Sequence, residues 1–269
     1  MLDVSVLICT YNREAMLVDT IRDVLNQTYP SFEVIVVDQT ASHQPETQAY
    51  LASVQDRIKL FHQAPSLTKA RNRALREAAG RILIFIDDDV RLSTHFIQEH
   101  VNAHQAGYTV VQGRVVVSKD ADKRPAQTPP FMNGMIKVTG RNDCQHKGAT
   151  NTLTGCNFSI EQGVVERVGY FDEYFQQLAI REDADYGLRC YRAGEKMIFW
   201  PQAELEHLRS DSGGVDTGIS NHFFAESYYR NELYFAHKHF SRFVVWLYQW
   251  RLKRRFSKNL KRLQRSLHP

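Results

Sequence analysis

The sequence predicts an α/β protein with a mostly parallel central sheet, helices on both faces of it, and a basic helical tail. Three observations carry this prediction. Short apolar runs rich in β-branched residues alternate with segments of helical periodicity, as the crossover units of a parallel sheet require. The chain has 269 residues, 43% of them hydrophobic, which is enough for a sizeable core. Residues 238–269 contain ten Lys or Arg and no acidic residue.

The first half of the chain shows the alternation most clearly. The run "VSVLICTYN" (4–12) is apolar and ends in polar residues, so it predicts a buried strand. A helix is predicted over 13–30, where apolar residues share one face and Pro30 stops it. Gly80 is expected to end a later helix. The other predicted elements are strands at 32–40, 58–63, 81–90 and 108–118, and helices at 46–55, 67–80 and 93–105.

The second half is less regular. Residues 119–150 include three prolines and three glycines and predict a long loop, a kind of segment that is usually functional or disordered. Regular structure is expected again over 155–175. A helix with acids in its first turn follows at 181–194, then a short strand at 196–201. The segment "ELEHLRSDSGG" (204–214) predicts turns.

Several features favour a cytoplasmic protein. No apolar run reaches the roughly 18 residues that a membrane span needs. The first residues lack the basic start and the cleavage site of a secretion signal. The four cysteines, Cys9, Cys144, Cys156 and Cys190, form no C-x-x-C pair, so reduced thiols are expected.

Three adjacent acids end one predicted strand, "RILIFIDDDV". On a strand, Asp87 and Asp89 point to one side and Asp88 to the other. Two carboxylates on one side suit Mg²⁺ or Mn²⁺, which commonly also holds substrate phosphates. A solvated turn or a helix cap is the alternative. Thr10, Tyr11, Asp38 and Gln39 also fall at predicted strand ends, where ligands of parallel sheets bind.

Six segments resemble, in order, family 2 glycosyltransferases with the GT-A fold, over about residues 3–215. They are "VSVLICTYNR", "FEVIVVDQT", "ARNRALREAAGRILIFIDDD", "TGCNFSIEQGVVERVGYFDE", "REDADYGLRCYRAG" and "EHLRSDSGG". The resemblance implies the GT-A form of a three-layer α/β/α fold. It also implies an inverting transferase that uses a nucleotide-diphosphate sugar and a divalent cation, Mn²⁺ or Mg²⁺.

The resemblance assigns the donor side of the site. It implies that Thr10 and Tyr11 line the nucleobase pocket, that Asp38 lies beside the base or ribose, and that Arg71 approaches the base and diphosphate. Asp87 would face the ribose, with Asp88 next to it in the nucleotide-sugar site. Metal ligands would be Asp89 and His207.

The resemblance also assigns the acceptor side. Asp183 would be the catalytic base, with Glu182 beside it, and Gly155, Cys156 and Asn157 would form the floor where donor sugar and acceptor meet. These residue types suit the chemistry, because an acceptor hydroxyl must lose a proton and a leaving nucleoside diphosphate gains charge.

One position departs from the family pattern. The family often has a second acid where this chain has Gln39 after Asp38. An amide can both donate and accept, so a pyrimidine still fits and a purine is not excluded. A UDP-sugar is therefore the favoured donor, with dTDP and GDP left open.

We divide the chain into a transferase domain (1–236) and the tail (237–269). The nucleotide-sugar-binding half of the domain is 1–118 and the acceptor-binding half is 119–236. Without residues 238–269, the body carries a net charge of −6 although the whole chain carries +4. The tail reads as a basic amphipathic helix with Trp246 and Trp250, which suits an anionic membrane surface. The alternative is a helix packed on the body or on a second chain. We expect no nucleic acid partner, since no RNA-binding motif is present.

The expected function is metal-dependent transfer of a sugar to a saccharide or lipid-linked acceptor in cell-surface or extracellular glycan synthesis. It would take place on the inner face of the cell membrane. Two rivals remain at this point. A sugar nucleotidyltransferase would show a Gly-rich basic loop after the first strand, and "CTYNREAML" has none. A non-catalytic binding module would lose nothing when Asp89 or Asp183 is changed.

Overall fold

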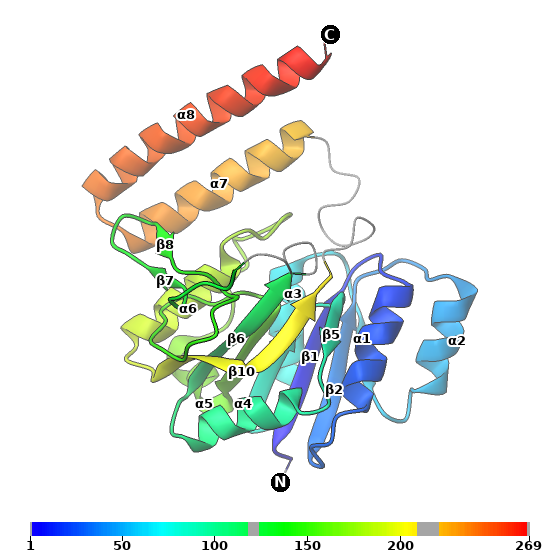
Figure 1. The fold of residues 1–269 in the computed structure, drawn as a ribbon. Helices are drawn as coiled ribbons and strands as arrows, with labels where there is room; N and C mark the ends of the chain where they lie inside the picture. Colours follow the sequence, from blue (N-terminus) through cyan, green and yellow to red (C-terminus); the bar gives the residue numbers. More distant parts are fainter. Residues whose placement is uncertain (1, 118–123, 209–220, 268–269) are drawn as a thin grey trace.

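An eight-stranded central sheet organises the protein (Figure 1). The structure is a computed structural model that describes residues 2–117, 124–208 and 221–267. The strand order is β3-β2-β1-β4-β9-β6-β10-β5. The strands are β1 (Val4–Thr10), β2 (Phe32–Asp38), β3 (Lys59–His62), β4 (Ile82–Ile86), β5 (Val90–Leu92), β6 (Val110–Val117), β9 (Asn157–Glu161) and β10 (Met197–His207).

Most neighbouring strands of this sheet are parallel, as predicted. β1 pairs in parallel with β2 and β4, β2 with β3, and β6 with β10. β9 lies antiparallel between β4 and β6, and β5 pairs antiparallel with the end of β10. The parallel pairing brings the carboxyl ends of β1, β2 and β4 to the same edge.

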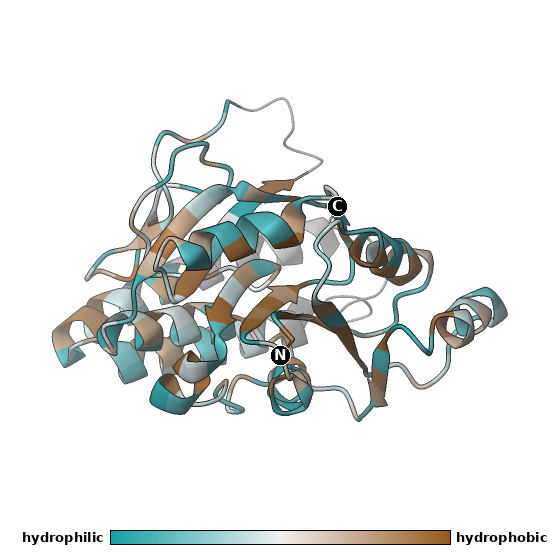
Figure 2. Ribbon diagram, turned by 90° about the horizontal axis from the view of Figure 1, so that it is seen from below, coloured by the Kyte–Doolittle hydropathy of each residue, from teal (hydrophilic) through white to brown (hydrophobic). Residues whose placement is uncertain are grey.

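Helices cover both faces of the sheet, which confirms the three-layer prediction. Alternate residues of β1 serve the two layers: Ile8 packs into one apolar cluster and Leu7 into the other. Figure 2 shows hydrophobic residues concentrated on the central strands. The first layer contains α1 (Ala15–Leu25), α2 (Pro45–Ser53) and α4 (Phe96–Gln105); the second contains α3 (Leu67–Glu77), α5 (Gln162–Val168) and α6 (Glu182–Arg192).

Two C-terminal helices, α7 (Asn221–His239) and α8 (Arg242–Leu267), lie beyond the sheet, next to α6 (Figure 1). A third apolar cluster joins them to α6 and to a small hairpin of β7 (Phe131–Met132) and β8 (Val138–Thr139). Val245 and Leu252 of α8 are buried. The first turns of the tail helix therefore pack on the body. The predicted domain boundary at 236/237 falls inside α7 and stays a prediction.

Three predicted elements were wrong in detail. The strand predicted at 81–90 is two strands, β4 and β5, and residues 87–89 lie between them. Gly80 does not end its helix, because α3 ends at Glu77 with Ala78 as its C-cap. Gly80 instead allows a close backbone approach, since a Cβ there would lie 2.5 Å from the Ser5 nitrogen. The predicted strand 196–201 continues to His207, so 204–207 is not turn-rich; the rest of that segment, 209–214, lies outside the described residues.

The longer strand has a physical reason. Residues 203–206 alternate buried and exposed, which is strand periodicity. Pro201 has no N–H for the ladder, and an irregularity in the β10–β6 register between Trp200 and Glu204 accommodates it. This irregularity carries the strand past the proline, so that His207 reaches the edge where β4 ends.

Candidate active site

A pocket of about 660 Å³ opens at the carboxyl edge of the sheet, where β4, β6, β9, β10 and α6 meet. Most of the predicted site residues with charged side chains line it. It also takes in part of the 124–150 loop. Its lining includes Arg71, Asp87, Arg114, Asn142, Thr154, Gly155, Cys156, Glu182, Asp183 and His207.

Asp87, Asp89 and His207 form a group of ligating atoms that all lie within 4.8 Å of one another. His207 Nε2 lies 3.1 Å from Asp89 Oδ1 and 3.8 Å from Asp87 Oδ2. The two acids lie close together, as predicted, although they stand between β4 and β5 and not on a strand; β10 brings the histidine from 118 residues along the chain. Two carboxylate oxygens and one imidazole nitrogen suit Mn²⁺ or Mg²⁺, so the residues present fit a divalent cation.

Asp88 is not part of this group and forms an ion pair with Arg13. The guanidinium of Arg13 lies 3.3 Å from an Asp88 oxygen and 3.1 Å from an Asp89 oxygen. Burial raises the pKa of Asp88 to about 7, against the lowering effect of Arg13. Sequence reasoning assigned Asp88 to the nucleotide-sugar site and missed Arg13. The sequence feature that could have indicated Arg13 is its position as a basic residue directly after the first predicted strand.

Arg71 is buried at the centre of the site. Its Nη1 donates to Glu182 Oε1 at 2.6 Å, its Nη2 lies 3.9 Å from Asp87, and the guanidinium stacks over Phe171. Burial, and then the neighbouring charge of Asp183, raise the pKa of Glu182 to about 8 despite this ion pair. Arg71 thus joins the strand that carries the acids to the first turn of α6.

Asp183 is the half-buried carboxylate of this turn. Its Oδ2 accepts a hydrogen bond from the Gly155 N–H at 2.9 Å, and its Oδ1 accepts one from the Ala184 N–H at 2.7 Å. Glu182 is more buried and is engaged by Arg71. Asp183 is therefore the better placed of the two to meet a ligand in the pocket.

The three residues predicted to form the floor of the site do not all line the pocket. Gly155 and Cys156 line the pocket, and burial raises the pKa of the Cys156 thiol, which keeps it protonated. Asn157 is fully buried below them. Its Nδ2 donates to the carbonyls of Arg114 and Ala203, so its side chain supports the pocket and does not line it.

Asp38 lies at the end of β2, fully buried and surrounded by donors. Its Oδ2 is 2.9 Å from His43 Nε2 and 3.3 Å from His62 Nδ1, and its Oδ1 accepts from the Thr40 N–H. A second pocket of about 380 Å³ lies beside these residues. The neighbouring histidines were not predicted as part of the site.

Gln39 lies directly after β2 and connects it to the backbone at the end of β1 and to the backbone just before α3. Its Nε2 donates to the Thr10 carbonyl at 3.1 Å, and its Oε1 accepts from the Ser66 N–H, just before α3, at 2.7 Å. Thr10 is buried and Tyr11 is half-buried at the end of β1. With both ends of its amide bonded to backbone, Gln39 holds the edge of the site together; the nucleobase contacts of all three residues stay predictions.

Comparison with known proteins was consistent with these features. A family model described as Glycosyl transferase family 2 matches residues 5–169. The GalNAc(5)-diNAcBac-PP-undecaprenol beta-1,3-glucosyltransferase of Campylobacter jejuni is 30% identical over 126 residues, which cover 44% of this chain and 40% of that enzyme. The chain therefore matches less than half the length of this relative.

Solved structures show the same GT-A fold. S. aureus TarS 1-349 in complex with UDP-GlcNAc matches with a TM-score of 0.63 and 17% identity, covering 87% of this chain and 66% of that chain. The mannosyltransferase PcManGT from Pyrobaculum calidifontis, in complex with GDP-Man and Mn²⁺, matches with a TM-score of 0.59 and 16% identity, covering 87% and 63%.

Proposed function

We propose that this chain, which belongs to glycosyl transferase family 2, transfers a sugar from a nucleotide-diphosphate sugar to a lipid-linked acceptor. The transfer inverts the anomeric carbon. The observation that carries the proposal is the shared pocket. It holds a carboxylate available as a base, Asp183, beside Asp87 and His207 of the cation-ligating group. Base and diphosphate site must face one another across the sugar in such a reaction.

Asp183 is the proposed general base. In an inverting transfer the acceptor hydroxyl attacks the anomeric carbon from the side opposite the leaving group and loses its proton to the base. The hydrogen bonds from Gly155 and Ala184 fix the carboxylate without neutralising it. Glu182 is engaged by Arg71 and is assigned to orienting this turn.

Asp87, Asp89 and His207 would hold a divalent cation. When bound, the cation would supply positive charge for the leaving diphosphate. Arg71 is 3.9 Å from Asp87 and adds a second positive group at this side of the pocket. The Mn²⁺ bound by the Pyrobaculum mannosyltransferase supports this assignment.

The donor is proposed to be a UDP-sugar, with GDP and dTDP sugars as the alternatives. The neighbouring structures hold UDP-GlcNAc and GDP-Man, so both base types occur on this fold. Thr10, Tyr11 and Asp38 are proposed to meet the base and ribose. His43 and His62 beside Asp38 are additional groups that can hydrogen-bond there.

The acceptor is proposed to be lipid-linked and to be met at the inner face of the cell membrane. The Campylobacter relative acts on an undecaprenol diphosphate acceptor. In the described part of the chain, no helix combines the length and the apolar character of a membrane span. The outer face of α8 instead exposes Phe243 (67%), Trp246 (62%) and Trp250 (54%). Aromatic residues at this spacing beside Arg251 and Arg254 suit an anionic lipid surface.

Asp183→Asn tests the proposal. The variant should keep its affinity for the nucleoside diphosphate and lose roughly 10²–10⁴ in transfer rate, the usual scale for a general base. Transfer from radiolabelled nucleotide sugars to a lipid-diphosphate acceptor gives the rate, and calorimetry with UDP and Mn²⁺ gives the affinity. Transfer by the variant at the wild-type rate would place the base elsewhere, with Glu182 as the first candidate.

A further inference from the structure

The segment before α6 has an unfavourable backbone. Gln177, Ala179 and Arg181 adopt φ values of 60°, 49° and 78°. Residues other than glycine rarely adopt this left-handed region, and such a conformation persists only where the surroundings hold it. Asp183 follows two residues later. Its position therefore depends on whatever holds this segment.

A first contact holds Arg181 from the C-terminal helices. Its Nε lies 3.0 Å from Glu232 Oε1, and the hydroxyl of Tyr248 donates to the other oxygen of Glu232. The guanidinium also lies 5.2 Å from the ring centroid of Phe235. Glu232 belongs to α7 and is 1% exposed, and Tyr248 belongs to α8. We call this group the Arg181 contact.

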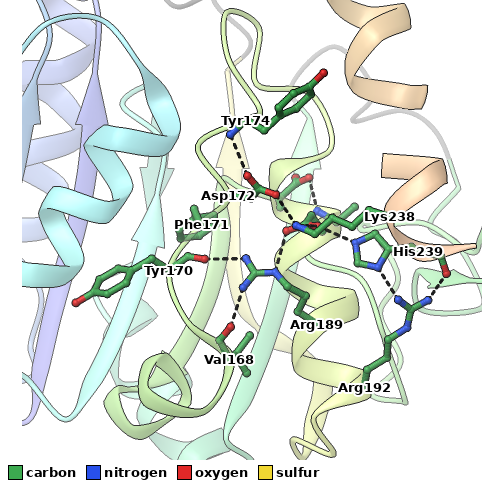
Figure 3. Close-up of polar contacts among 12 residues, drawn as sticks. Val168, Tyr170, Phe171, Asp172, Tyr174, Arg189, Arg192, Lys238 and His239 are labelled. Atoms are coloured by element: carbon green, nitrogen blue, oxygen red, sulfur yellow. Dashed lines mark hydrogen bonds and ion pairs between the residues drawn. The ribbon is translucent and has the colours of Figure 1, made fainter. Parts of the chain in front are cut away.

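A second contact holds Asp185, which is fully buried. Its carboxylate lies 2.7 Å from His239 Nε2, 2.8 Å from Lys238 Nζ and 2.9 Å from Arg189 Nε. Figure 3 shows the side chains of Arg189, Lys238 and His239 converging at the end of α7. Arg192 donates to His239 Nδ1, so the proton on Nε2 is the one given to Asp185. We call this group the Asp185 contact.

The two contacts bracket the proposed base. Arg181 is the N-cap residue of α6, and its carbonyl accepts a hydrogen bond from the Asp185 N–H at 2.8 Å. Within the helix, residue 183 lies about 200° around the axis from residue 185. The side chain of Asp183 accordingly turns the other way, to the Gly155 N–H in the pocket. A shift of α7 would therefore move the Asp183 carboxylate, because the Arg181 and Asp185 contacts hold the chain on both sides of it.

We propose that α7 and the first turns of α8 set the position of Asp183 through the Arg181 and Asp185 contacts. Glu232, Tyr248, Lys238 and His239 are positioning residues that touch no substrate. The proposal rests on the proposed function in one respect, the role of Asp183 as base. Proton transfer needs hydrogen-bond distance, and a displacement of about 1 Å can cost about 10²-fold in rate.

Two substitutions weaken the Arg181 contact to different extents. Glu232→Gln removes the charge opposite Arg181, and Tyr248→Phe removes a single hydroxyl. We expect Glu232→Gln to lower kcat roughly 10- to 100-fold and Tyr248→Phe to lower it less. The donor KM and the affinity for UDP with Mn²⁺ should stay unchanged in both, because neither residue lines the pocket.

Glu195→Gln is the matched control. It makes the same chemical change in another ion pair, Arg167–Glu195 at 2.6 Å, which lies past the C-terminal end of α6. Its kcat should equal that of the wild type. A loss of kcat in this variant as large as in Glu232→Gln would mean that any weakened ion pair slows the enzyme, and would overturn the proposal.

The Asp183→Asn background separates this proposal from the proposed function. In that background Glu232→Gln should cause no further loss, since the base whose position it sets is gone. Near wild-type transfer by Asp183→Asn alone would refute the base, and the positioning proposal with it. An inactive Asp183→Asn together with full kcat in Tyr248→Phe and Glu232→Gln would refute the positioning proposal alone. If Glu232→Gln does not fold, Tyr248→Phe decides: an unchanged kcat counts against the proposal.

Discussion

Gly155→Ala should damage the site through Arg71. A Cβ on Gly155 would lie 2.3 Å from Arg71 Nη2, closer than Cβ atoms approach other heavy atoms in real structures, and 3.1 Å from its Cζ, which is also tight. Arg71 is 3% exposed and bonded to Glu182, so it has little room to move. Overpacking of this kind costs about 1–3 kcal/mol. If Arg71 is forced away from Glu182, the cost rises to about 3–5 kcal/mol, since a buried charge loses its partner.

Urea unfolding measures this cost. A loss of about 2 kcal/mol corresponds to a fall in Tm of about 4–8 °C for a domain of this size. Gly163→Ala is the control, because its Cβ would approach only the end of the exposed Arg167 side chain, at 3.0 Å. Because alanine is favoured over glycine in a helix by up to about 1 kcal/mol, Gly163→Ala should not lose stability. Equal urea midpoints for Gly155→Ala and the wild type would refute the close packing of Arg71 against this glycine.

Two further predictions concern α8 and α6. Replacing Trp246 and Trp250 together by alanine should leave Tm nearly unchanged, since both are exposed, and should weaken binding to anionic vesicles about tenfold or more. Tyr191→Ala, which also changes an exposed aromatic residue, is the control. Equal vesicle binding by the wild type, the double variant and the control would remove the membrane from the proposed function. Although burial raises it, the hydrogen bond from His239 and the charges of Arg189 and Lys238 bring the pKa of Asp185 down to about 2. The stabilising effect of its charge is thus present above about pH 4 and lost towards pH 2. The difference in unfolding free energy between the wild type and Asp185→Asn should therefore shrink by about 1 kcal/mol from pH 6 to pH 3. A difference that stays constant over this range would contradict the ion network around Asp185.

Local sequence patterns predicted the part of the site that lies at strand ends. Alternation along "IDDDV" placed Asp87 and Asp89 on one side, and parallel pairing of β1, β2 and β4 gathered their polar ends. These features depend on a period of two and on the direction of neighbouring strands. Both can be read from a few adjacent residues.

Contacts between distant segments were not predictable in this way. His207 entered through the family resemblance, while the strand that carries it was taken for a turn because Pro201 interrupts the apolar pattern. Arg13 and His62 belong to polar segments whose acidic partners lie far along the chain, whereas His43 lies only five residues from Asp38. Glu232 and His239 sit about 50 residues from the helix they contact, so no local periodicity relates them to Asp183.

Thermal shift with nucleoside diphosphates tests the proposed donor site most directly. Ligands that bind only the folded state stabilise it by about 2.7 kcal/mol at a concentration of 100 Kd, or about 5–10 °C in Tm. We predict such a rise for UDP with Mn²⁺, a smaller rise for UDP with a chelator, and no effect of Mn²⁺ on UDP binding by Asp89→Asn. A wild-type protein whose Tm responds to none of UDP, dTDP and GDP with Mn²⁺ would contradict the nucleotide-sugar site, and an Asp89→Asn variant that responds like the wild type would contradict the cation site within it.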